Sequence, residues 1–334
     1  MSIRVPAELT ERDAEVLAPA AGLVYLPDDE PGITRVRRGK GFSYVDAFGK
    51  TVHGAERDRI EALAIPPAWV QVWISPDPRS YLQASGLDDA GRKQYRYHDD
   101  FLAFSEHRKF ARLPYFGQAL PIIRKVTQKA VDREPVGARD HAIAAAIRLI
   151  DTCLLRVGNH RSAANGHYGA TTLTVEHVID DDTVELEYAA KSGQTRTIVV
   201  EDDDMADILV DLADDADDEL FWFEDGEGER RRATASDINE FIAEHAGPAF
   251  SAKDFRTWGG SKAALEARAE GDEVLEAVDA AAEELGNTRA VARNSYIHPQ
   301  VIEAADEQVE AAWNSSRTSK WGDRADHALR KLLS

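Results

Sequence analysis

The sequence of 334 residues contains one cysteine, Cys153, so a disulfide within the chain is impossible. It also lacks any apolar run close to the roughly 20 residues that a membrane-spanning helix needs. Its first residues do not show the basic start and apolar block of a secretory signal. These absences exclude a disulfide scaffold and a membrane protein, and they favour a reducing, cytoplasmic setting.

Basic residues are scarce: 40 lysines and arginines stand against 60 acidic residues, giving a net charge of −20. A chain of that charge repels nucleic acid if its charge is evenly spread. The spread is uneven, because residues 201–334 carry 33 acidic and 14 basic residues, whereas residues 101–200 carry 11 and 13. Fifteen acids and no base lie between Glu201 and Glu229. This acidic run is typical of a solvated surface, and it leaves room for a neutral-to-basic binding face elsewhere.

Several motifs of catalysis and cofactor binding are missing. The chain has no GxxxxGK[ST] loop for a nucleoside triphosphate, no CxxC or HExxH spacing for zinc, and no GxSxG nucleophile turn. Its acidic run lacks the spaced Asp/Asn–Gly pattern of a calcium loop. The sequence therefore predicts no cofactor and no metal.

Residues 30–97 are expected to form a small, mainly β domain. Residues 47–50 are typical of a hairpin turn between strands at 42–45 and 51–52. Residues 55–63 predict a short helix, and residues 69–75 alternate apolar and polar side chains as a half-buried strand does. The first thirty residues show no strong pattern.

From His98 onward the pattern is that of long amphipathic helices. They are predicted over 98–113, 117–132 and 138–158, the last with Gly158 as its C-terminal cap. Three strands are expected next, at 172–173, 184–188 and 197–199, with a turn at 191–193 between the second and third. Helices are expected from 201 to the end. We therefore predict an α+β protein, with a β-rich N-terminal domain over residues 1–97 and a mainly α-helical domain over residues 98–334 that carries a three-stranded sheet insert.

Four residues are candidates for chemistry: Arg156, Lys191, Arg256 and Tyr296. Each alone has an ordinary explanation. Arg156 ends an apolar helix, where a cation stabilises the helix dipole, and Lys191 lies in a turn that solvent would cover. Arg256 could stack on neighbouring aromatic rings, and Tyr296 could be a buried tyrosine with its hydroxyl satisfied.

Taken together, two arginines, a lysine and a tyrosine are the groups that metal-free phosphoryl transfer requires. Arginine guanidiniums bind the non-bridging oxygens of a phosphodiester, most strongly in the transition state. A tyrosine hydroxyl can attack phosphorus and form a covalent intermediate. A lysine can give a proton to the departing 5′-oxygen. The set therefore indicates chemistry at a phosphodiester.

Four segments resemble, in the same order, the active-site blocks of type IB DNA topoisomerases, in particular the small bacterial enzymes similar to the poxvirus ones: LLRVGN, AAKSGQ, KDFRTWGG and GNTRAVARNSYIHP. The segment GRKQYRYH (91–98) resembles the DNA-contacting strand of that family. NGHYGATTLT (165–174) resembles the segment after its first catalytic arginine. The resemblance extends from about Ile33 to the C-terminus.

The resemblance implies a role for each candidate. Tyr296 would be the nucleophile, forming a 3′-phosphotyrosyl link and freeing a 5′-hydroxyl. Arg156 and Arg256 would hold the non-bridging oxygens, and Lys191 would be the general acid. Many relatives have a histidine nine residues before the tyrosine, where this chain has Asn287. Asparagine donates a hydrogen bond but cannot become cationic, so the pH dependence of a histidine should be absent.

The resemblance also implies contacts with DNA. It places Gln94, Tyr95 and Tyr97 at the major groove, where glutamine can pair with adenine. Four basic residues would contact phosphates, the last of them near the scissile phosphate: Arg92, Lys93, Arg96 and Lys253. The alternative for residues 92–97 is an edge strand whose charges discourage pairing with another chain.

The resemblance implies a monomeric enzyme at the nucleoid, whose two domains form a C-shaped clamp on duplex DNA. It would relax supercoiled DNA by cleaving one strand, letting it rotate and resealing it, without ATP or metal. Two alternatives stay open. A tyrosine recombinase shares the Arg–Lys–Arg–Tyr set but typically has a histidine-rich second arginine block, and a non-catalytic duplex DNA-binding protein could have the same fold.

Overall fold

The computed structural model describes residues 3–180, 183–189 and 195–334. The chain divides into two compact units, one formed by Ala7–Lys109 and the other by Met1–Pro6 with Phe110–Ser334. Each unit has a hydrophobic core of its own. The protein has the α+β architecture that its sequence predicts.

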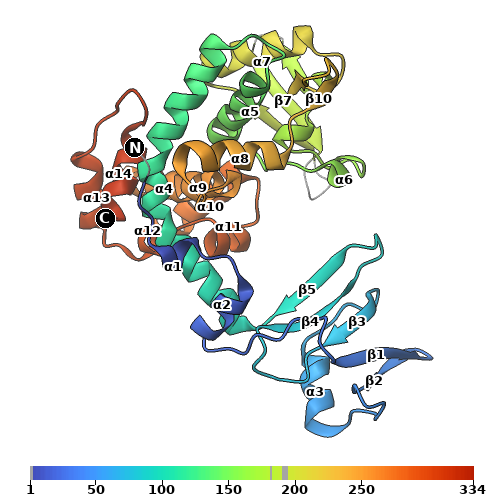
Figure 1. Cartoon of the computed structure of the whole chain (residues 1–334). Helices are drawn as coiled ribbons and strands as arrows, with labels where there is room; N and C mark the ends of the chain where they lie inside the picture. The colour runs from blue at the N-terminus through green and yellow to red at the C-terminus, as the bar shows by residue number, and fades with distance from the viewer. Residues whose placement is uncertain (1–2, 181–182, 190–194) are drawn as a thin grey trace. The chain divides into compact units, whose positions relative to one another are not determined.

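The N-terminal unit is built on a five-stranded antiparallel sheet in the order β2-β1-β3-β4-β5 (Figure 1). Its strands are β1 (Ile33–Arg38), β2 (Gly41–Val45), β3 (Val70–Ile74), β4 (Leu82–Leu87) and β5 (Lys93–Tyr97). Its helices are α1 (Ala7–Thr10), α2 (Ala14–Ala20) and α3 (Gly54–Ala62).

Both faces of this sheet are covered, because successive side chains of a strand point to opposite faces. On β3, Val72 and Ile74 pack with Ile60 of α3, whereas Trp73 packs on the other side with Leu17 of α2. The expected hairpin, the helix at 55–63 and the strand at 69–75 are all confirmed. Helices α1 and α2 lie where the sequence shows no strong pattern.

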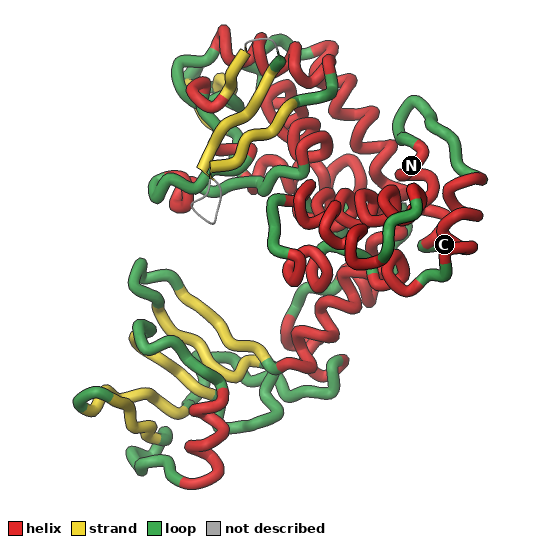
Figure 2. The backbone as a smooth tube through the Cα atoms, turned by 180° about the vertical axis from the view of Figure 1, so that it is seen from behind, coloured by secondary structure: helices red, strands yellow, loops and turns green. Residues whose placement is uncertain are grey.

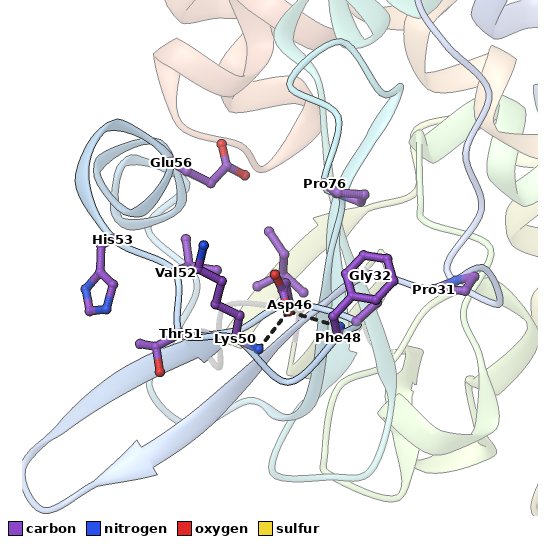
Figure 3. Close-up of a pocket in the computed structure, with 12 residues that line it drawn as sticks. Pro31, Gly32, Asp46, Phe48, Lys50, Thr51, Val52, His53, Glu56 and Pro76 are labelled. Carbon is purple, nitrogen blue, oxygen red and sulfur yellow. Dashed lines mark hydrogen bonds between the residues drawn. The ribbon is translucent and has the colours of Figure 1, made fainter.

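A surface cavity of about 640 Å³ lies beside the turn that follows β2 (Figure 3). The turn is held by Asp46, whose carboxylate accepts hydrogen bonds from the N–H groups of Phe48 and Lys50 at 3.0 and 2.8 Å. The cavity is lined by this turn and by the start of α3, near the β2 edge of the sheet. The expected DNA-contacting residues lie on β5, the strand at the other edge, so the cavity is not part of the candidate site.

The second unit is mainly helical. Its helices are α4 (Asp99–Arg133, which begins before the boundary at Phe110), α5 (Arg139–Cys153), α6 (His160–Ala163), α7 (Asp203–Asp215), α8 (Ala235–Ala246), α9 (Ala252–Glu270), α10 (Val274–Leu285), α11 (Arg289–Ser295), α12 (Pro299–Glu303), α13 (Asp306–Asn314) and α14 (Arg324–Leu332). Helix α9 is central, because it contacts α5, α8, α10, α12, α13 and α14. Every residue of α9 from Asp254 to Ser261 is buried.

The inserted sheet consists of β6 (Val178–Asp180), β7 (Val184–Ala189) and β8 (Thr195–Val199), paired antiparallel in that order. Figure 2 shows these strands together at one end of the helical unit. The second and third expected strands are confirmed. The first expected strand is wrong, because residues 170–172 form a 3₁₀ turn and the pairing strand begins at Val178. The turn expected at 191–193 lies outside the described residues.

Three other expectations for this unit are wrong. Residues 98–113 and 117–132 belong to one helix, α4, which contains Pro114 and Pro121. Helix α5 ends at Cys153 rather than near Gly158, because Leu154 adopts a left-handed conformation with φ of 49°. The helices after 201 are interrupted by a hairpin of β9 (Trp222–Glu224) and β10 (Arg230–Arg232).

Among the described residues, no helix is both long enough and apolar enough to cross a membrane.

Candidate active site

Arg156 lies in the irregular segment that follows α5, two residues beyond Leu154. It is therefore not the end of a helix, and stabilisation of a helix dipole does not explain it. The carbonyls of Arg156 and Val157 accept hydrogen bonds from the N–H groups of Ala170 and Thr171, both at 2.9 Å. These bonds join the segment that contains Arg156 to residues 165–174.

Arg256 lies on α9 and only 3% of it is exposed. Its guanidinium donates to the carbonyl of Leu154, and its Nη2 donates to the carbonyl of Leu285 at 2.8 Å. Its Nε is buried and has no hydrogen-bond partner among the described residues. Burial, together with repulsion from Arg156, lowers the pKa of Arg256 to about 10. Burial and the neighbouring arginine therefore disfavour the charged form of this guanidinium.

Asn287 lies between α10 and α11 and contacts Arg156 directly. Its Oδ1 accepts a hydrogen bond from Nη2 of Arg156 at 2.7 Å. Its Nδ2 is buried without a partner in the part of the chain that the structure describes. Asn287 and Arg256 therefore each have one buried donor nitrogen without a partner among the described residues, and each is hydrogen-bonded to the backbone or side chain that positions it.

Tyr296 follows α11 directly, and its side chain is hydrogen-bonded to Arg256. The guanidinium carbon of Arg256 lies 5.1 Å from the centre of the Tyr296 ring. Burial by itself would raise the pKa of the Tyr296 hydroxyl. The positive charges of Arg256, Arg156 and the exposed Lys253 outweigh burial, so the pKa lies below the ordinary value of 10.0. The structure thus brings together Arg156, Arg256, Asn287 and Tyr296, with Lys253 near them.

The backbone of Tyr296 is held by residues of α9 that the sequence did not single out. Ser261 Oγ donates to the Tyr296 carbonyl at 3.2 Å and accepts from the N–H of His298 at 2.9 Å. A Cβ at Gly260 would lie 2.7 Å from Cδ1 of Leu285 and 3.2 Å from Cβ of Tyr296. The two glycines that end the KDFRTWGG block are the local sign of this close approach in the sequence.

Lys191, the expected general acid, lies outside the described residues. The strands that flank it, β7 and β8, are described, and they pair in register from Glu185↔Val199 to Ala189↔Thr195.

The six expected DNA-contacting residues at 92–97 belong to the N-terminal unit. Residues 93–97 form β5, an edge strand, in agreement with the prediction of a strand there. Alternation along the strand places Lys93, Tyr95 and Tyr97 on one face and Gln94 and Arg96 on the other. The five residues of β5 therefore point to two faces of the strand.

Several of these residues already have partners within the unit. Arg92 and Gln94 donate to Asp88 at 2.8 and 2.9 Å, and Lys93 pairs with Asp28 at 2.8 Å. The rings of Tyr95 and Tyr97 stack with their centres 5.8 Å apart, and 44% of Tyr95 is exposed. The tyrosines are thus the apolar surface that β5 offers.

Among the described residues, no group of three or more His, Cys, Asp or Glu side chains is arranged to hold a metal ion.

The chain is similar to known proteins over most of its length. Residues 98–320 match the family described as eukaryotic DNA topoisomerase I, catalytic core, and residues 41–88 match the N-terminal domain of bacterial DNA topoisomerase IB. The chain is also similar to DNA topoisomerase 1B of Acanthamoeba polyphaga mimivirus. The two are 31% identical over 293 residues, which covers 81% of this chain and 87% of the relative.

The match to the catalytic core covers most of the helical unit, and the match to the N-terminal domain precedes it. Together the two matches define a DNA-binding isomerase. The chain belongs to the type IB DNA topoisomerase family.

Proposed function

We propose that the protein relaxes supercoiled DNA by transient cleavage of one strand, rotation of the free end and religation. Tyr296 is the nucleophile. Arg156 and Arg256 bind the non-bridging oxygens of the scissile phosphate, and Asn287 adds a neutral donor to one of them. Lys191 is assigned as general acid through the resemblance of its segment to the family.

The observation that carries this proposal is the pair of unused buried donors beside a tyrosine with a lowered pKa. A buried donor without a partner costs about 1–3 kcal/mol. A phosphate oxygen would supply acceptors to both Arg256 Nε and Asn287 Nδ2, and its charge would relieve the repulsion between the two arginines. The arrangement therefore favours binding of an anion, and most strongly the more charged transition state.

The reaction balances without an added reactant. The Tyr296 oxygen forms a bond to phosphorus and loses its proton to solvent, while the bond between phosphorus and the 5′-oxygen breaks. The 5′-oxygen takes a proton from Lys191 and leaves as a hydroxyl. Religation is the reverse attack of that hydroxyl on the phosphotyrosine. Because the phosphotyrosyl bond conserves the energy of the phosphodiester, no ATP is required.

DNA binding by the two units is also proposed. The exposed tyrosines and basic residues of β5 would contact the duplex, and Lys253 would contact a phosphate near the cleaved bond. We propose that a single copy of the chain suffices, because all groups assigned to the reaction come from one helical unit.

The test compares wild type with Tyr296→Phe on supercoiled plasmid, in EDTA and without ATP. Wild type is expected to relax the plasmid and to form a covalent adduct with a nicked duplex that resists denaturation. Tyr296→Phe should do neither while still binding DNA, since it lacks only the attacking oxygen. Relaxation by Tyr296→Phe would show that another residue is the nucleophile, and inactivity of wild type in all salt conditions would refute the proposed activity.

A further inference from the structure

Arg196 on β8 reaches across to the C-terminus of α10. Its Nη1 donates to the carbonyl of Leu285 at 3.3 Å, and its Nη2 donates to the carbonyl of Glu284 at 2.5 Å. The last carbonyls of a helix have no partners within the helix, and a cation there is favourable. On the neighbouring strand, the buried Tyr188 is the cross-strand partner of Arg196 and is hydrogen-bonded to it. The guanidinium is thus fixed by groups on two elements.

The carbonyl of Leu285 is shared with the candidate active site. It accepts a hydrogen bond from Arg196 at 3.3 Å and another from Arg256 at 2.8 Å. The position of this one oxygen therefore determines where Nη2 of Arg256 lies. A displacement of the end of α10 would move Arg256 with it.

A single residue, Gly286, separates Leu285 from Asn287. Gly286 has φ of 57°, and a Cβ there would lie 3.0 Å from the guanidinium carbon of Arg196. Arg196 therefore packs on the turn itself, and Gly286 is required both by its conformation and by this contact. Asn287 follows and holds Nη2 of Arg156 at 2.7 Å. Leu285 thus contacts Arg256, and Asn287 contacts Arg156.

We propose that Arg196 is a positioning residue for DNA cleavage and religation. It holds the Leu285–Asn287 turn so that Arg256 and Asn287 direct their unused donors at the same phosphate. Its own guanidinium is used by backbone carbonyls and Tyr188, so it acts through its neighbours. This inference rests on the proposed function, because it assumes that these residues bind the scissile phosphate.

The first experiment measures the rate of covalent adduct formation in a single turnover at saturating duplex DNA. Arg196→Ala is expected to cleave about 10- to 100-fold more slowly than wild type, because small displacements of a catalytic group cost rates of that size. Arg196→Lys keeps the charge but offers a single nitrogen, so it should recover part of the rate. Thr197→Ala, an exposed neighbour on β8, is the matched control and should cleave as wild type does.

A direct phosphate contact by Arg196 would give a different result. DNA affinity is measured with Arg196→Ala in a Tyr296→Phe background, which binds without reacting. A positioning residue leaves the Kd within about twofold of the background value, and this result also shows that the variant is folded. A Kd weakened enough to account for the defect, with a normal rate at saturating DNA, would overturn the proposal. If Arg196→Ala does not fold, the same two measurements on Arg196→Lys decide the question.

A double-mutant cycle tests whether the effect passes through the turn. If Arg196 acts through Asn287, the loss from Arg196→Ala should be much smaller in an Asn287→Ala background than in wild type. Losses that multiply would show independent roles and overturn the proposal. Wild type is the internal reference: if it forms no adduct, the proposed function fails and the inference with it, whereas equal rates for wild type and Arg196→Ala refute the inference alone.

Discussion

The oxygen and the nitrogen of the Asn287 side-chain amide have different roles. Its oxygen accepts from Arg156, so its nitrogen is the group left without a partner. A histidine at this position could accept from Arg156 only through an unprotonated ring nitrogen, because a cationic ring has two donors and no acceptor. Asparagine can accept from Arg156 and still keep a donor for a second partner at every pH. We therefore infer that this position contributes a neutral donor, in contrast to the two arginines.

Lys253 gives a prediction about pH. Its positive charge contributes to lowering the pKa of Tyr296, after the larger contributions of Arg256 and Arg156. In Lys253→Gln the Tyr296 pKa should rise, so the rise of the cleavage rate with pH should move to higher pH. Because Lys253 is exposed, we expect this shift to higher pH to be small and to shrink at high salt. The measurement is the single-turnover rate against pH at saturating DNA.

The control for this prediction is Lys129→Gln, which removes the charge of an exposed lysine on α4. Its pH profile should match that of wild type. A profile for Lys253→Gln that overlays wild type at low salt would show that Lys253 has no influence on the nucleophile.

At the scale of elements, Pro114 explains how α4 is joined to the segment after Tyr296. Proline has no N–H, so Pro114 cannot donate to the carbonyl of Phe110 four residues earlier. The ring of His298 is hydrogen-bonded to that carbonyl. The other ring nitrogen, Nδ1, accepts from the N–H of Gln300 at 3.1 Å and caps α12. His298 thus links two elements in its neutral form.

His298 should make stability depend on pH. Burial lowers its pKa from 6.5 to about 4, so the folded protein binds this proton less readily than the unfolded chain. The resulting stability is intact above about pH 6.5 and falls as the pH drops toward 4. In His298→Asn the side chain can still cap α12 but does not titrate. Its free energy of unfolding should therefore fall less between pH 7 and pH 5, by about 1 kcal/mol after allowance for partial exposure.

Urea unfolding at the two pH values measures this difference. The same substitution at His107, which is exposed on α4, should leave the wild-type dependence in place. Equal losses of stability in wild type and His298→Asn would contradict the assignment.

On the surface of the whole molecule, the acidic run between Glu201 and Glu229 is partly neutralised by neighbouring arginines. Three consecutive arginines of β10 pair with acids of the run: Arg230 with Asp217, Arg231 with Asp225, and Arg232 with Glu219. Helix α7 buries Met205, Leu209 and Leu212 and exposes carboxylates on its other side. The run is therefore a folded, solvated surface over at least this helix.

We expect this surface to act on solubility and not on catalysis. Replacing the exposed Asp203, Asp207 and Asp211 of α7 with asparagine should leave plasmid relaxation within about twofold of wild type. The triple variant should be less soluble, because it loses negative charge that keeps molecules apart. Relaxation time courses and the concentration at which protein precipitates measure the two effects. A large change in relaxation would place α7 close to the DNA.

Local patterns predicted much of the fold. Alternation and turn residues identified β2, β3 and the hairpin that joins β2 to Thr51, since these features depend on neighbours in sequence. The pattern failed where backbone effects dominated. The break expected between residues 113 and 117 is absent, because α4 continues through Pro114 and Pro121, and Leu154 ends α5 through a left-handed conformation that its side chain does not favour.

The order of residues along the chain defines which chemical groups are available: the ordered blocks that contain Arg156, Arg256 and Tyr296 indicated both the family and the kind of reaction. Only the tertiary structure showed that Arg196 and Arg256 share the carbonyl of Leu285, although Arg196 and Leu285 are 89 residues apart. Every residue has a backbone carbonyl, so a contact to one leaves no mark in the amino-acid pattern. The availability of that oxygen depends on where α10 ends and what packs against it, and folding alone decides both.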